Sequence, residues 1–231
     1  MDFSRRTVLG MAIAGGGVAV MARAQAATAP AAYVVTYLET GAAEAQAAAA
    51  LLRQAAATSR RAAGNLFAYA LEESGRPSRF ALIAGWRDAD TLAAHQRAEA
   101  ASGLATKVGA LLVSPPDRRP STALSVAPAA AAPTTTAVYV VTHADIVPPA
   151  KAQAIPVLEQ LAGEARRDSG NLWFDVFYQN SRPNHFTLFE AWRSPQAFDA
   201  YRRAAGTRVA RQKVLPMQGA LYDERVYRAL G

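Results

Sequence analysis

"SGNLWFDVF" at residues 169–177 decides the fold, because a weaker copy, "AGNLFAYAL", stands at residues 63–71. The similarity extends well beyond these nine residues. Residues 60–87 and 166–193 are identical at 11 of 28 positions, at a constant offset of 106 and without a gap. We infer that the chain is a tandem duplication of one folding unit.

Both copies contain the same order of predicted elements. "YVVTYLE" and its counterpart "YVVTHADI" are rich in β-branched and aromatic residues and predict the first strand of each repeat. A helix follows, alanine-rich in the first copy (41–59) and beginning near Pro148 in the second. Two further strands lead to predicted helix N-caps at Asp88 and Ser194, and a last strand closes each repeat. This β-α-β-β-α-β order is ferredoxin-like and places the protein in the α+β class.

The third strand of the second repeat, "HFTLFEAW", is apolar on both faces. Phe186, Leu188, Glu190 and Trp192 share one face. A sheet with two apolar faces needs a cover on each, so we expect helices on one side and the sister repeat on the other. The sequence therefore predicts two tandem ferredoxin-like repeats packed sheet to sheet as an intramolecular pseudo-dimeric α/β barrel.

The amino terminus has the features of an export signal. Arg5 and Arg6 precede the apolar run "VLGMAIAGGGVAVMA", and "AQA" at 24–26 supplies the small residues of a cleavage site. The arginine pair predicts the twin-arginine route and a periplasmic or secreted protein. The apolar run is short and glycine-rich, so no stable membrane span is expected after processing. An uncleaved membrane anchor is the alternative.

The expected organisation follows from these signals and from the Ala/Pro/Thr-rich stretch between the repeats. It comprises a signal peptide (1–26), a first repeat (32–127), a linker (128–136) and a second repeat (137–231).

Composition excludes several classes of chemistry. The chain has no Cys, which excludes disulfides and thiol catalysis. Three scattered His do not form a zinc motif, so no metal is expected. The net charge of +7 is spread over arginine-rich helices, and no basic stripe with interleaved aromatic residues predicts binding to nucleic acid.

The motifs "GNLWFDVF" and "RPNHFTLFEAW" resemble the antibiotic biosynthesis monooxygenase family, which includes small quinol monooxygenases. Members share this strand–helix order, a Glu-x-Trp that ends the third strand and often a His in the following helix. Here the second repeat keeps Glu190 and Trp192 but has Tyr201 at the helical His position, whereas the first keeps Trp86 and His95 but has Ala84 for Glu. The resemblance implies a barrel fold and, within a superfamily of varied activities, an oxygenase.

Cofactor-free oxygenation of a quinol requires a base, a hydrogen-bond donor for an oxyanion and aromatic walls. The predicted catalytic residues are His143, Glu190, Trp192 and Asn171. The predicted substrate-binding residues are Trp173, Asp175, Tyr201, Phe186 and Asp145, with Asn65, Trp86 and His95 as first-repeat counterparts.

Each polar candidate has two interpretations. His143 with Asp145 nearby is either a base or an inert histidine at a strand end. Glu190 is either an acid with a raised pKa or the partner of a cation such as Arg193. Asn171 is either an oxyanion donor or a turn residue after glycine.

The sequence predicts a monooxygenase that oxidises a quinol or other small aromatic compound with dioxygen and without a cofactor. The alternative is a non-catalytic periplasmic binding module for a quinone, haem or another apolar ligand. Whether the pseudo-dimer pairs again as a homodimer stays open.

Overall fold

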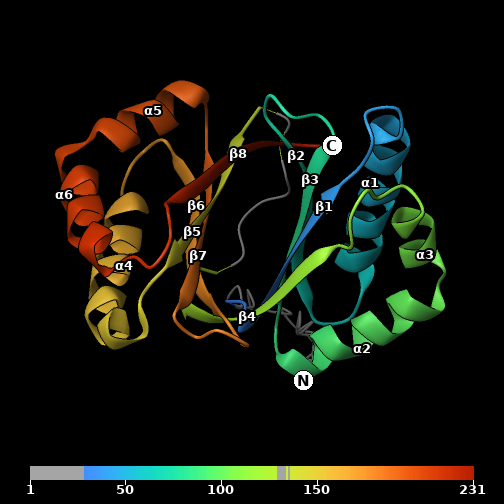
Figure 1. Ribbon diagram of the computed structural model, residues 1–231, viewed down its shortest axis with the longest axis horizontal. Helices are drawn as coiled ribbons and strands as arrows, with labels where there is room; N and C mark the ends of the chain where they lie inside the picture. Colours follow the sequence, from blue (N-terminus) through green and yellow to red (C-terminus); the bar gives the residue numbers. More distant parts are fainter. Residues whose placement is uncertain (1–28, 129–133, 135) are drawn as a thin grey trace, which may run out of the picture.

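A computed structural model of the protein describes residues 29–128, 134 and 136–231. The predicted signal peptide, with its twin arginine, and most of the predicted linker lie outside these residues. Both repeats fold as predicted, with the strands in the middle of the molecule and the helices on its two sides (Figure 1).

The first repeat consists of β1 (Ala32–Glu39), α1 (Ala45–Arg61), β2 (Asn65–Glu73), β3 (Arg79–Trp86), α2 (Ala89–Ala101), α3 (Leu104–Gly109) and β4 (Asp117–Ser125). The second repeat consists of β5 (Val138–Asp145), η1 (Pro148–Ala150), α4 (Lys151–Ala165), β6 (Asn171–Gln179), β7 (His185–Trp192), α5 (Pro195–Arg203), α6 (Ala205–Val214), η2 (Leu215–Met217) and β8 (Asp223–Ala229).

The second helical region of each repeat begins at its predicted cap. Asp88 accepts a hydrogen bond from the N–H of Thr91, and Ser194 accepts one from the N–H of Ala197. These contacts satisfy backbone donors that the first turn leaves free, so both predicted N-caps are confirmed. Each region then divides into two helices, at Gly103 with φ of 70° and at Ala204 with ψ of 141°.

The eight strands close into one barrel in the order β1-β3-β2-β8-β5-β7-β6-β4. The last strand of each repeat pairs with the second strand of the sister repeat, β4 with β6 and β8 with β2. Every strand thus has two neighbours, and no sheet edge is left unpaired in the barrel. This closure confirms the predicted pseudo-dimeric barrel.

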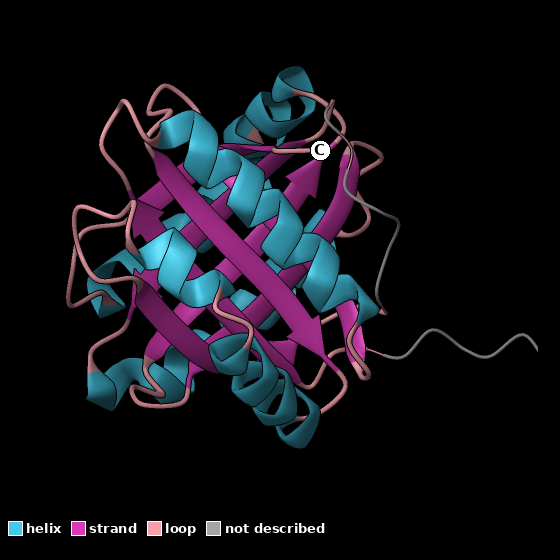
Figure 2. Cartoon of the chain, turned by 90° about the vertical axis from the view of Figure 1, so that its right-hand side faces the viewer, coloured by secondary structure: helices cyan, strands magenta, loops and turns pink. Residues whose placement is uncertain are grey.

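The core has three layers, and the helices lie outside the strands (Figure 2). Aromatic side chains from both repeats fill the barrel, α1–α3 cover the outer face of the first sheet, and α4–α6 cover that of the second. None of the helices in the described ranges is long and apolar enough to cross a membrane.

Candidate functional site

The strands of the second repeat separate the predicted site residues into two groups, one inside the barrel and one beneath the helices. His143, Trp173 and Asp175 point into the barrel. Phe186, Trp192 and Tyr201 lie on the other side of the sheet, beneath the helices. The predicted residues therefore do not form one pocket.

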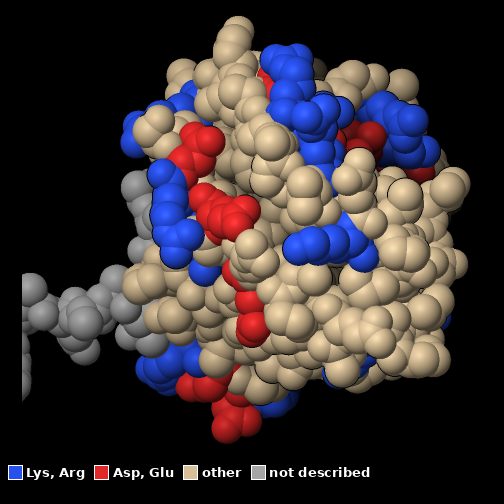
Figure 3. Space-filling view, turned by 90° about the vertical axis from the view of Figure 1, so that its left-hand side faces the viewer, with Lys and Arg blue, Asp and Glu red and all other residues tan. Residues whose placement is uncertain are grey.

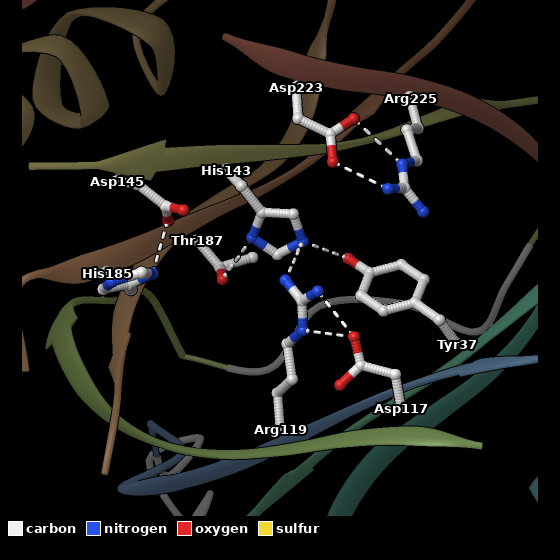
Figure 4. Close-up of polar contacts among 9 residues, drawn as sticks. All are labelled: Tyr37, Asp117, Arg119, His143, Asp145, His185, Thr187, Asp223 and Arg225. Carbon is white, nitrogen blue, oxygen red and sulfur yellow. Dashed lines mark hydrogen bonds and ion pairs between the residues drawn. The ribbon is translucent and has the colours of Figure 1, made fainter. Parts of the chain in front are cut away.

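His143 is the centre of a polar cluster inside the barrel (Figure 4). Its Nε2 lies 2.6 Å from the hydroxyl of Tyr37 and 3.1 Å from Nη1 of Arg119, and its Nδ1 lies 3.0 Å from Oγ1 of Thr187. Because Arg119 can only donate, Nε2 accepts and the ring hydrogen is on Nδ1. Burial, and secondly the charge of Arg119, lower the pKa of His143 to about 4. A neutral imidazole whose lone pair is already engaged does not suit a base near neutral pH.

Asp145 contacts a different histidine from the one expected. Its Oδ1 lies 2.8 Å from Nδ1 of His185, and Figure 4 shows no hydrogen bond or ion pair between Asp145 and His143. The interpretation of His143 and Asp145 as a base and its partner therefore lacks the contact it needs.

The sequence analysis did not identify the two arginines of this cluster. Arg119 pairs with Asp117, and Arg225 pairs with Asp223 through two hydrogen bonds. Both guanidinium groups lie 5.0 Å from the centre of the Tyr37 ring. A signal was present, because Asp-x-Arg at 117–119 recurs at 223–225 with the offset of the duplication. A cavity of about 230 Å³ adjoins this end of the barrel.

Asp175 lies inside the barrel, where its contacts hold neighbouring segments of the chain together. It accepts hydrogen bonds from the Tyr33 hydroxyl (2.6 Å) and from the N–H of Ala127 (2.9 Å), and Arg166 lies 3.8 Å away. Burial raises the pKa of this carboxyl, although the hydrogen bond from Tyr33 lowers it in part. Asp175 thus connects strands of both repeats with the chain that leaves β4.

Trp173 and the two asparagines also have structural contacts. Trp173 packs edge-on against Phe67, with 4.7 Å between the ring centres. Asn171 donates a hydrogen bond to the carbonyl of Trp173, and Asn65 donates one to the carbonyl of Phe67. This equivalence fits the turn interpretation, since each amide is used by the backbone two residues on.

Glu190 is buried beneath the helices of the second repeat. Its side chain is 1% exposed and accepts a hydrogen bond of 2.9 Å from Nε1 of Trp192. Trp192 in turn stacks on Tyr201, with 4.3 Å between the ring centres. Burial raises the pKa of Glu190 to about 8, although the hydrogen bond from Trp192 lowers it. Arg193 instead donates to the carbonyl of Ser169.

A cavity of about 170 Å³ lies between the strands and helices of the second repeat, and Glu190 is not among its lining residues. It is lined by Ala144, Leu158, Leu161, Leu188, Arg211, Gln212, Val214, Leu215, Gln218 and Tyr222. Leu188 precedes Glu190 on the same face of β7. Sequence reasoning missed Arg211 and Tyr222.

Arg211 is the positive charge of this cavity wall. Its Nη2 lies 2.7 Å from Oε2 of Glu224, and its guanidinium lies 5.1 Å from the centre of the Tyr222 ring. The charge of Arg211 lowers the pKa of Glu190, so the two groups interact electrostatically. The cavity therefore combines apolar walls with one cation, and this cation interacts with a buried carboxyl whose pKa is raised to about 8.

The first repeat has a different arrangement at the same place. Trp86 and His95 lie 4.7 Å apart, ring centre to ring centre, and His95 contacts Ser59 at 3.0 Å. Burial lowers the pKa of His95. Since Ala84 replaces the glutamate, Nε1 of Trp86 has no hydrogen-bond partner in the described part of the chain. A cavity of about 30 Å³ adjoins Trp86 and His95. The counterpart of the second repeat's cavity, lined among others by Leu52, Leu82 and Leu112, measures about 70 Å³.

Among residues 29–128, 134 and 136–231, no group of three or more His, Asp or Glu side chains could hold a metal ion.

Solved structures share this fold. The "putative monooxygenase" of Fusobacterium nucleatum subsp. nucleatum ATCC 25586 aligns with a TM-score of 0.78 at 12% identity, over 88% of this chain and 94% of that one. The "putative monooxygenase" of Lactobacillus acidophilus NCFM aligns with a TM-score of 0.73 at 9% identity, over 87% and 95%. An anthrone oxidase-like protein aligns with a TM-score of 0.65 at 15% identity, over 87% and 91%.

Comparison with curated protein sequences finds no match. The family model described as Antibiotic biosynthesis monooxygenase matches residues 31–105 and again residues 137–213. The two matches fall on the two repeats and together cover more than half of the chain, so the protein belongs to the antibiotic biosynthesis monooxygenase family and carries its domain twice.

Proposed function

We propose that the cavity of the second repeat binds a small quinol or phenol and that the protein oxidises it with dioxygen, without a cofactor. One observation carries the proposal: Glu190, a buried carboxyl whose pKa is raised to about 8, interacts electrostatically with Arg211, which lies on the wall of an apolar cavity. Perturbed titration in a cleft is typical of functional groups.

The size and lining of the cavity suit one aromatic ring. A dry apolar cavity of about 150 Å³ in another protein binds benzene, and this cavity of about 170 Å³ is slightly larger. Its leucines supply apolar walls, and the polar side chains of Arg211 and Tyr222 supply a place for the substrate hydroxyl.

The first step of the proposed oxidation is removal of a proton from the substrate hydroxyl, which requires a base. The carboxylate of Glu190 removes the hydroxyl proton of the substrate, because a phenolate gives up an electron to dioxygen far more readily than a phenol does. The resulting radical and superoxide combine at a ring carbon, which forms a C–O bond. Loss of water then gives a quinone. A quinol and dioxygen thus give a hydroxyquinone and water, with one oxygen atom in each product.

Arg211 stabilises the negative charge that develops on the substrate oxygen. Its guanidinium has five N–H donors in a fixed plane, so its contact with Glu224 leaves others free for a phenolate. Trp192 positions the carboxyl of Glu190 through its Nε1 hydrogen bond.

Replacement of Glu190 by Gln tests this assignment. The substitution keeps the size of the side chain and removes the base, and loss of one general base slows turnover by about 10²–10⁴-fold. Oxygen uptake with a panel of quinols should fall by this amount in Glu190→Gln. Glu72→Gln is the matched control, because Glu72 is also buried but is paired with Arg228 where β2 meets β8. Equal activity in Glu190→Gln and the wild type would refute the role of Glu190.

A binding module is the second candidate, and one observation favours it. Glu190 and Arg211 already have partners in Trp192 and Glu224, so the cavity holds no unsatisfied charge that demands a substrate. A wild-type protein that binds a quinone, measured by quenching of tryptophan fluorescence, but consumes no oxygen with any quinol would support this alternative.

A further inference from the structure

Residues 200–222 form a basic segment that supplies part of the wall of the cavity of the second repeat. The segment runs from the end of α5 through α6 and η2 to the start of β8. It contains no Asp or Glu, and its five basic residues are Arg202, Arg203, Arg208, Arg211 and Lys213. Arg208 and Lys213 are exposed, and the structure gives neither an ion-pair partner in the described ranges.

Exposed apolar side chains lie beside these charges. We call Val147, Leu215, Leu221 and Tyr222 the rim. Leu221 is 95% exposed and Leu215 is 66% exposed, values that neither residue would have if it served the core. Leu215 and Tyr222 also line the cavity, and Val147 is joined to η2 by a hydrogen bond to the carbonyl of Met217. The rim therefore continues the apolar wall of the cavity to the surface.

The first repeat shows that the fold does not require this basic segment. Its equivalent residues, 94–116, carry Arg97, Lys107 and Glu99, a net charge of +1 compared with +5 in residues 200–222. The same helix pair covers the same face of the sheet in both repeats. In the second repeat Arg202, Arg203 and Arg211 pair with Asp199 and Glu224, which flank the segment, so the charges that have no ion-pair partner in the described ranges are Arg208 and Lys213.

Figure 3 looks onto the side of the molecule that α4–α6 cover. A broad area without charged side chains occupies the lower right-hand part of this face, and Lys and Arg side chains, with some Asp and Glu among them, lie along its upper edge. Apolar side chains next to basic ones are the arrangement with which proteins bind an anionic lipid surface, since the apolar groups enter the acyl boundary and the cations bind phosphate.

We propose that the rim and the basic residues Arg208 and Lys213 dock the protein on an anionic phospholipid bilayer, with the mouth of the cavity facing the lipid. A quinol dissolved in the bilayer would then enter the cavity along continuous apolar surface without crossing water. This substrate class rests on the proposed function, whereas the docking itself rests only on the surface.

Vesicle flotation tests the docking. The chain that begins at Ala27 is suitable, because it keeps every helix and strand of the structure and lacks the apolar amino-terminal run. It should float with vesicles of equal parts phosphatidylcholine and phosphatidylglycerol, less so with phosphatidylcholine alone, and less in high salt.

Two variants separate the contributions. Arg208→Glu with Lys213→Glu should weaken binding by about 25-fold or more, because each cation near such a surface contributes about fivefold. Leu215→Ser with Leu221→Ser should weaken it by about tenfold or more through lost apolar contact. The matched control is Lys107→Glu with Val113→Ser in the first repeat, where Val113 is 64% exposed, and it should bind as the parent does.

Several results would overturn the proposal. Equal loss of binding in the control would show a general charge effect, and binding unaffected by the leucine substitutions would show electrostatic adsorption alone. Self-association that the leucine substitutions abolish, without vesicle binding, would identify a second copy as the occupant of the rim. Glu190→Gln separates docking from catalysis, since it should lose quinol oxidation and still float.

Discussion

The replacement of Ala84 in the first repeat by Glu190 in the second changes the hydrogen bonding of the neighbouring tryptophan. In the second repeat Glu190 accepts the hydrogen bond of Trp192 and titrates near neutral pH. At the same position of the first repeat Ala84 leaves Nε1 of Trp86 without a partner in the described part of the chain, and the counterpart of the second repeat's cavity measures only about 70 Å³. A single carboxyl therefore distinguishes the second repeat from the first at this position.

The same carboxyl makes the stability of the fold depend on pH. The pKa of Glu190 is about 8 in the fold and 4.5 ordinarily, so the folded state holds an additional proton between these values. Its contribution is complete below about pH 4.5 and is lost as the pH rises towards 8, on the order of 3–5 kcal/mol. Chemical denaturation of Glu190→Gln should show a smaller loss of stability between pH 6 and pH 9 than the wild type.

The contribution of His143 to stability changes with pH in the opposite direction, so a His143 variant is the control for the Glu190 variant. Its pKa is about 4 in the fold and 6.5 ordinarily, so its contribution is complete above about pH 6.5 and is lost as the pH falls towards 4. His143→Gln should therefore flatten the acid side of the profile and leave the alkaline side unchanged. Identical profiles for both variants and the wild type would contradict both assignments.

Alternation along single strands located each candidate side chain, but it did not show which face of each strand is the inside of the barrel. His143 and Glu190 were expected in one site because a base and an acid belong together chemically. Closure of the barrel separates them, and it brings His143 instead to Tyr37 and Arg119 of the other repeat. No local pattern contains such a contact between distant residues.

At the level of elements, the sequence predicted most of the fold correctly. Caps such as Asp88 and Ser194 depend on local hydrogen bonds, so they can be found from residue type and spacing. The start of β4 could not be predicted from the sequence, because Asp117–Pro120 is charged and contains proline, as loops do. This segment is a strand because β1 pairs with it on one side, while β6 pairs with the rest of β4 on the other.

The exchange of last strands leads to a prediction about the isolated second repeat. Residues 137–231 alone would leave β6 without β4 and β8 without β2, and would expose the apolar inner face of the sheet. We expect this fragment to dimerise or aggregate. Light scattering measures this, and addition of residues 27–127 should convert the fragment into a complex of one copy of each. A soluble, folded monomer of the fragment would contradict the expectation.

At the scale of the whole molecule, the export signal predicted from the sequence concerns the compartment in which the barrel works. We propose that the twin-arginine route exports the chain and that cleavage after Ala26 leaves a protein that begins at Ala27. Intact-mass spectrometry of the periplasmic fraction should find this species. Arg5→Lys with Arg6→Lys should keep the precursor in the cytoplasm, while the melting temperature of the mature barrel stays the same. Full-length protein in the membrane fraction of wild-type cells would instead identify an anchor.

The contact between Tyr37 and His143 has a consequence for how the molecule can evolve. The two residues occupy equivalent positions, 106 apart, and meet each other across the approximate two-fold axis of the barrel. A dimer of identical chains would place tyrosine against tyrosine there, or histidine against histidine, since every mutation in its gene appears on both sides of the axis. Fusion of the two halves into one gene removed that restriction. Each half can now change alone, so one can specialise in chemistry while the other conserves the scaffold that holds it.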